Sequence, residues 1–160
     1  MGCNAGGIQN CRYCGFSSYK PCPITTTIIS NSINATNLNR TILELIYSSV
    51  NDRKTIDLSN LNIHSIHNET FLGLSKLENL YLQNNSIRRI EFYSKDLQSL
   101  RLISLEFNNI VQINKSILVG LNKIESVCLF NNPISNLFPT EMLKICETNP
   151  ICKVYINEKC

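Results

Sequence analysis

The sequence lacks the features that mark a membrane protein, a nucleic-acid-binding protein or an enzyme. It has no apolar run of roughly 18 or more residues, the length that a membrane-spanning helix needs. Lysine and arginine are scattered and the formal net charge is +3, which indicates no basic patch. It contains no G-x-S-x-G element, no phosphate-binding glycine loop and no recognisable pair of carboxylates. We therefore expect a protein that is no enzyme, needs no cofactor, spans no membrane and binds no nucleic acid.

Cysteine is absent from the middle of the chain and concentrated near its ends. Residues 23–127 contain none, whereas the flanking parts contain four each: Cys3, Cys11, Cys14, Cys22, Cys128, Cys146, Cys152 and Cys160. An even number clustered in this way predicts disulfides that staple both ends of the chain. Because disulfides persist in oxidising compartments, we expect an extracellular protein, either secreted or part of an ectodomain. The first twenty residues lack the apolar centre of a signal peptide, so we expect a mature form.

The N-terminal cysteines have an alternative interpretation, because four cysteines can also bind zinc. Structural zinc sites usually bring two close pairs, and here only Cys11 and Cys14 form one. His64 and His67 have no cysteine or acidic residue around them at the spacing of zinc ligands, so we expect exposed loop histidines. The prediction is a disulfide framework without a metal.

A repeat fills the cysteine-free middle of the chain. The pattern L-x-x-L-x-L-x-x-N-x-I begins at Leu77 and returns at Leu100 and Ile124, and a weaker copy begins at Arg53. The starts are 24, 23 and 24 residues apart, within the period of about 20 to 29 that is typical of leucine-rich repeats. The sequence resembles the leucine-rich repeat family over roughly residues 53–137.

Each position of the repeat has a physical task. Alternating residues such as Leu80 and Leu82 point inward from an extended segment, and stacked copies make a parallel sheet with one continuous core. Asn85, Asn108 and Asn132 should form a ladder that satisfies backbone groups where the chain leaves each strand, unless they are ordinary turn asparagines. The resemblance implies an α/β fold, a leucine-rich repeat solenoid shaped as a short curved horseshoe with the parallel sheet on its concave face.

Repeat stacks need caps, since the core leucines of the end repeats would otherwise be exposed. We divide the single domain, residues 1–160, into an N-terminal cap (1–52), about four repeats (53–137) and a C-terminal cap (138–160). In the N-terminal cap we expect a strand over residues 23–30 and a helix over residues 36–50 whose buried stripe is Leu38, Ile42, Leu45 and Ile46. In the C-terminal cap we expect a short helix from Thr140 and a last strand over residues 152–156.

One disulfide can be argued from the repeat length, because Cys152 follows Cys128 by 24 residues. If residues 152–156 add a strand in the same register, the two cysteines become neighbours and could bond. The alternative is that Cys152 alternates with Val154 and Ile156 in an inward-facing set, which would turn it toward the core. Cysteine-containing caps also make the chain resemble extracellular animal leucine-rich repeat proteins, such as Toll-type receptor ectodomains and the variable lymphocyte receptors of jawless fish.

The outward-facing residues of the repeats are the candidates for binding. Their aromatic and apolar members gather in the later repeats, and exposed aromatics of this kind anchor interfaces. The predicted ligand-binding residues of the concave face are Tyr81, Gln83, Leu102, Glu106, Phe107 and Phe130. The alternative is that the C-terminal cap folds over this patch, which would bury Phe130 in particular.

The resemblance implies a recognition module, receptor or innate-immune related, that binds a protein or, as a lesser alternative, a lipid or glycan. Two other functions stay open: a structural role as a homodimer, and inhibition of a secreted enzyme. Five sequons could carry glycans, at Asn34, Asn39, Asn68, Asn84 and Asn114. A glycan at Asn84 would obstruct part of the concave face and move the expected site toward Leu102, Phe107 and Phe130.

Overall fold

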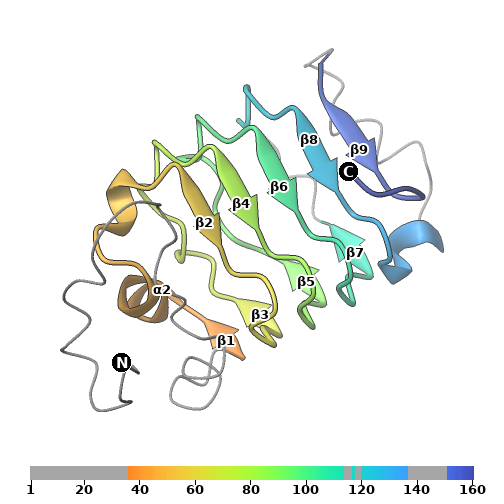
Figure 1. Ribbon diagram of the computed structural model, residues 1–160, viewed down its shortest axis with the longest axis horizontal. Coiled ribbons are helices and arrows are strands. Elements are labelled where there is room, and N and C mark those ends of the chain that lie inside the picture. Colours follow the sequence, from red (N-terminus) through yellow and green to blue (C-terminus); the bar gives the residue numbers. More distant parts are fainter. Residues whose placement is uncertain (1–35, 114–116, 118–119, 137–150) are drawn as a thin grey trace, which may run out of the picture.

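A five-stranded parallel sheet dominates the computed structural model, which describes residues 36–113, 117, 120–136 and 151–160 (Figure 1). Successive repeats contribute neighbouring strands, in the order β2 (Thr55–Asp57), β4 (Asn79–Tyr81), β6 (Leu102–Ser104), β8 (Ser126–Cys128) and β9 (Lys153–Tyr155). Each strand is short because only the alternating segment of a repeat is extended. The predicted parallel sheet is confirmed.

The period of the repeat sets the pairing of these strands. Leu80 lies opposite Ile56 on one side and Ile103 on the other, and Ile103 lies opposite Val127. All four side chains are buried in one core, together with the other leucine and isoleucine positions of the repeats. Full burial of such a side chain contributes about 1.5–3 kcal/mol relative to exposure. The same sequence pattern therefore produces both the sheet and the core.

Four strands of two residues each line the other side of the core (Figure 1). β1 (Asn37–Leu38) pairs with β3 (Ser65–Ile66), and β5 (Arg89–Ile90) pairs with β7 (Gln112–Ile113), both in parallel. In the core, the rings of Phe71 and Phe92 pack edge to face with centroids 5.0 Å apart. Two 3₁₀ turns, Val50–Asp52 and Pro133–Asn136, complete the described elements.

The helix of the N-terminal cap begins later than the sequence predicted. α2 spans Arg40–Ile46 and starts after Asn39, whose Oδ1 accepts a hydrogen bond from the backbone N–H of Ile42 at 3.0 Å. Its buried face is centred on Leu43. The prediction that Leu45 is buried was wrong, because it lies roughly 200° around the helix from Leu43 and is 67% exposed.

A single phenol closes the N-terminal edge of the five-stranded sheet. The hydroxyl of Tyr47 donates to the backbone carbonyl of Asp57 at 2.7 Å and accepts from its backbone N–H at 2.8 Å. These are the groups that a further strand would use for pairing. Burial raises the pKa of Tyr47 above its usual value of 10.0, and the Arg53 guanidinium lies 5.3 Å from the ring centre. The sheet therefore ends at β2 without an open pairing edge at this residue.

The asparagine ladder is present as predicted. Oδ1 of Asn108 accepts from the backbone N–H of Ile87 at 3.0 Å, and Nδ2 donates to the carbonyls of Leu82 at 2.9 Å and Leu105 at 3.0 Å. Asn85 and Asn132 make the corresponding bonds to their own and the preceding repeat. All three side chains are buried. They supply partners to backbone groups that the packed stack separates from water.

The last strand joins the sheet in a register that the repeat length did not predict. Tyr155 lies opposite Cys128, an offset of 27 residues (155 − 128) instead of 24. Cys152 packs against the core with Val154, as the alternative interpretation held. Cys128 bonds to Cys160, with their Cα atoms 5.5 Å apart, and Cys152 is itself disulfide-bonded. The proposed Cys128–Cys152 pair was therefore wrong.

Some expectations fall outside the described residues. They are the strand over residues 23–30, the helix from Thr140, the sequons Asn34 and Asn114, and the cysteines Cys3, Cys11, Cys14, Cys22 and Cys146. Within the described part of the chain, no helix combines the length and apolar character that crossing a membrane requires.

Replacing Asn108 with alanine tests the ladder. Asn108→Ala leaves one buried N–H and two buried carbonyls without their partner, so we expect the free energy of unfolding to fall by about 2–4 kcal/mol. The exposed neighbour provides a matched control, since Asn109→Ala removes the same side chain outside the ladder. Urea denaturation followed by circular dichroism measures both, and equal stabilities of the two variants would contradict the role of the ladder.

Candidate functional site

The outward side chains of the five-stranded sheet form what we call the open face. Register places them in rows that cross the strands at right angles. The central row contains Asp57, Tyr81, Ser104, Cys128 and Tyr155, and the row beside it contains Thr55, Asn79, Leu102, Ser126 and Lys153. Every repeat thus contributes equivalent positions to this face, where Ser104 and Cys128 are buried.

Alternating charges border the open face at the start of the strands. Lys54 Nζ lies 2.9 Å from Glu78 Oε1, and Arg101 Nη1 lies 2.5 Å from Glu125 Oε1. The hydrogen bond from Lys54 holds the pKa of the Glu78 carboxyl below its usual value of 4.5, and Arg101 adds to this effect. Two cations and two anions compensate one another, so this border offers no net charge to a ligand.

The structure brings the six predicted binding residues onto the open face, all of them half-buried. Tyr81 and Leu102 belong to the adjacent strands β4 and β6. Gln83 follows β4, and its Oε1 is buried without a hydrogen-bond partner in the described part of the chain. An unpartnered buried acceptor costs free energy.

Phe107 and Phe130 form an aromatic pair that follows β6 and β8, at the end of the strands opposite the charged border. Their rings pack edge to face with centroids 5.6 Å apart. Phe107 has a left-handed backbone, with φ of 54°. The equivalent residues that precede the ladder slot in the other repeats are asparagines with the same conformation: Asn60, Asn84 and Asn131. Asparagine tolerates this conformation, whereas a bulky aromatic side chain is strained in it.

Residues 159 and 160 contact the same end of the open face. After β9 the chain turns back toward β8 (Figure 1). The Cys160 N–H donates to Glu106 Oε1 at 3.2 Å, and Lys159 Nζ lies 5.8 Å from the ring centre of Phe107. Cys160 is also bonded to Cys128, which has no exposed surface.

Sequence analysis missed the part that Lys159 and Cys160 play in the site. The alternative that the C-terminal cap folds over the patch holds for Phe107, which Lys159 contacts. Phe130, which this alternative expected to be buried in particular, is half-buried. Tyr81 and Leu102 make none of these contacts. One signal was available: a cysteine at an outward strand position, Cys128, requires a partner that comes over the face of the sheet.

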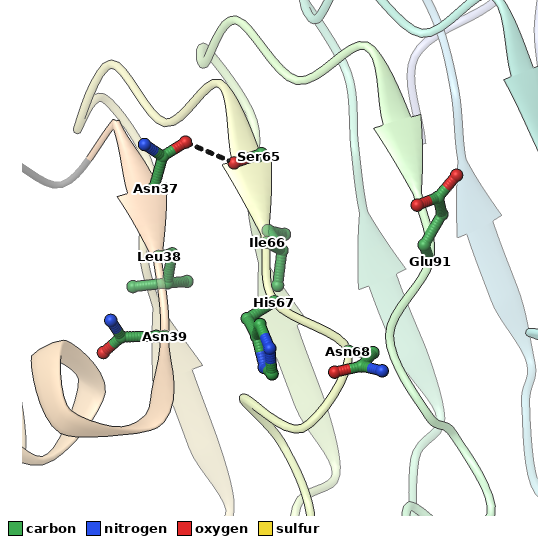
Figure 2. Close-up of a pocket in the computed structure, with 8 residues that line it drawn as sticks. All are labelled: Asn37, Leu38, Asn39, Ser65, Ile66, His67, Asn68 and Glu91. Carbon is green, nitrogen blue, oxygen red and sulfur yellow. Dashed lines mark hydrogen bonds between the residues drawn. The ribbon is translucent and has the colours of Figure 1, made fainter.

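A separate cavity of about 460 Å³ lies beside β1 and β3, away from the five-stranded sheet. Figure 2 shows polar side chains around its apolar floor, with Glu91 on one side. The lining residues are Asn37, Leu38, Asn39, Ser65, Ile66, His67, Asn68 and Glu91. None of the six predicted binding residues reaches it.

Two of the described sequons line this cavity, and the third belongs to the open face. Asn39 caps α2, while Nδ2 of Asn68 donates to the Tyr93 hydroxyl at 3.1 Å. Asn84 is exposed at the end of its strand. His64 and His67 are exposed, and in the described residues no cluster of histidine, cysteine and acidic side chains could hold a metal ion.

Comparison with protein families agrees with the repeat architecture over part of the chain. A family model described as leucine rich repeat matches residues 54–94, from β2 to just beyond β5. The match supports the leucine-rich repeat family. It includes Asn85, the first residue of the ladder, and Tyr81 and Gln83 of the open face. The leucine-rich repeats at Leu100 and Ile124 lie outside the matched residues but share their strand register. No curated protein matches the chain.

The strain at Phe107 can be measured by substitution. Phe107→Asn installs the residue of the equivalent positions and relieves about 1 kcal/mol of backbone strain, while it removes an aromatic contact of about 0.5–1.5 kcal/mol. We expect the free energy of unfolding to stay within about 1 kcal/mol of the original protein. Phe107→Val keeps an apolar but β-branched residue and should be less stable than Phe107→Asn in urea denaturation. The reverse order would contradict the strain.

Proposed function

We propose that the chain is a recognition module without enzymatic activity that binds a protein partner through the open face, the concave side of a curved solenoid. Leucine-rich repeat domains commonly mediate protein–protein interaction. The observation that carries the proposal is Phe107, an aromatic residue in a strained backbone position where the equivalent residues are asparagines. Strain that folding does not require is typical of functional positions.

The apolar residues of the open face support this assignment. Tyr81, Leu102, Phe107 and Phe130 are half-buried and keep part of their surface exposed. Aromatic side chains in such surroundings supply much of the binding free energy of protein interfaces.

The charges beside the open face favour a partner that is recognised by shape and hydrogen bonding over one that is attracted by charge. The ion pairs of Lys54 with Glu78 and of Arg101 with Glu125 neutralise the border of the face. A partner is therefore selected by apolar fit and hydrogen bonding at the centre of the sheet, and we expect its affinity to depend little on ionic strength.

The open face can be tested by placing a photo-crosslinking amino acid at position 81 or 102 and exposing the full chain to extracellular fluid of its source. We expect a protein adduct from both positions, and the double variant Tyr81→Ala with Leu102→Ala should weaken binding of that protein about a hundredfold or more in calorimetry. Two anchor side chains are removed by this variant, while the fold is retained.

Val111 provides the matched control. It is 51% exposed and lies outside the five-stranded sheet, so a crosslinker at position 111 should give no such adduct and Val111→Ala should leave the affinity unchanged. Equal affinities of Val111→Ala and the double variant would refute the open-face site.

An extracellular location is part of the proposal, with a receptor or innate-immune role as its narrower form. The Cys128–Cys160 disulfide supports it, because such bonds persist in oxidising compartments. A glycan on the exposed Asn84 would cover the Tyr81 end of the open face and restrict the partner to the Leu102 end.

Oxidation of all the cysteines tests the location. We expect the intact mass of protein purified from its source to lie below the fully reduced mass by the eight hydrogens lost when eight cysteines form disulfides. The measurement is mass spectrometry before and after reduction in denaturant. Free thiols at most of the eight positions would argue for a reducing compartment.

The two alternative functions make different demands on the chain. A homodimer would have to use the open face or the β9 edge of the sheet, and sedimentation at rising concentration would reveal it. An inhibitor of a secreted enzyme would use the open face in the same way as any protein partner, so identification of the crosslinked protein separates these functions.

A further inference from the structure

We propose that residues 157–160 are a disulfide-latched cover over the C-terminal part of the open face, and that a thiol reductant releases it. The inference rests on the proposed function, because a cover regulates only a face that binds. It assigns two surfaces to the open face: a free part around Tyr81 and Leu102, and a latched part around Glu106 and Phe107.

Within the described residues, three contacts attach the cover, and all of them reach the latched part. Cys160 forms the disulfide with Cys128 and donates its N–H to Glu106 Oε1 at 3.2 Å. Lys159 Nζ lies 5.8 Å from the centre of the Phe107 ring. Phe107 in turn packs edge to face on Phe130. The cover therefore occupies the strained aromatic position that best marks the open face as a binding surface.

Among the contacts that the described residues make with the cover, the disulfide is the strong one. Residues 157–160 are exposed, and a single hydrogen bond and a cation–π contact are both weak at an exposed surface. The disulfide keeps the Lys159 ammonium near Phe107 by raising its effective concentration there. Without the bond, the loss of chain freedom on ordering four residues opposes these contacts.

The environment of the two sulfurs sets the order of the opening reaction. Cys160 is an exposed residue, whereas Cys128 has no exposed surface, so a thiolate of a dithiol reductant attacks Sγ of Cys160. The Cys128–Cys160 bond breaks, a mixed disulfide forms at Cys160, and Cys128 leaves as a thiolate that takes up a proton. The second thiol of the reductant then displaces Cys160 as a thiol and closes the reductant into its own disulfide. Two electrons pass from the dithiol to the protein.

Cys160→Ser opens the latch without a reductant and leaves Cys128 as a reporter. Under native conditions we expect a maleimide to alkylate Cys128 in this variant within about tenfold of its rate in the denatured chain. Hydroxyl-radical footprinting should show increased oxidation of Phe107, with Tyr81 unchanged as an internal reference. Peptide mass spectrometry reads both positions. A Cys128 that stays unreactive, or a Phe107 signal equal to that of the original protein, would overturn the proposal.

Two further variants complete the test. Lys159→Ala removes the cation–π contact but keeps the disulfide. Hydroxyl radicals should therefore oxidise Phe107 less in this variant than in Cys160→Ser. A chain shortened after Asn157 should show the same Cys128 alkylation and Phe107 oxidation as Cys160→Ser. It replaces Cys160→Ser in the test if that variant does not fold. None of these measurements uses a partner, so failure of the latch leaves the binding function standing at Tyr81 and Leu102. Loss of the binding function would leave the measured exposure unchanged.

Discussion

The structure depends on the hydrogen bonds that pair backbone groups where the chain leaves each strand inside the packed stack. At that point backbone N–H and C=O groups are separated from water, and leaving them unpaired costs more than most side-chain contacts return. Asn85, Asn108 and Asn132 supply the missing partners, and each one bonds both its own repeat and the one before it. The side chain therefore fixes the distance between repeats, and the strand register, the core and the rows of outward residues all follow from that distance.

The residue before each ladder asparagine connects this scaffold with recognition. The turn requires a left-handed backbone there, and Asn60, Asn84 and Asn131 adopt it at little cost. Phe107 adopts it at a larger cost and gains contacts with Phe130 and Lys159. A position that the scaffold could fill without strain is thus occupied by a residue suited to an interface.

Sequence reasoning succeeded where the repeat template constrains the chain. The inward positions around Leu80 and the ladder asparagines were predictable because packing and hydrogen bonding demand particular residue types at fixed spacing. The register of β9 was not, because the connection from β8 has no template slots and its length determines the offset of 27 residues (155 − 128). The partner of Cys128 could not be deduced for the same reason, since the return of residues 157–160 depends on that offset. Leu45 was misplaced because the predicted stripe was counted from Leu38, which lies in β1 and not in the helix, whose buried residue is Leu43.

The hydroxyl of Tyr47 limits where a further repeat could be added to the molecule. Because one hydroxyl occupies both the N–H and the C=O of Asp57, no additional strand can attach at that point without displacing it. A duplicated repeat that enters between existing repeats avoids this edge, and its asparagine finds a preceding repeat to bond. Lengthening of this protein by gene duplication would thus conserve the Tyr47 end and multiply the middle, and with it the number of outward positions available for recognition.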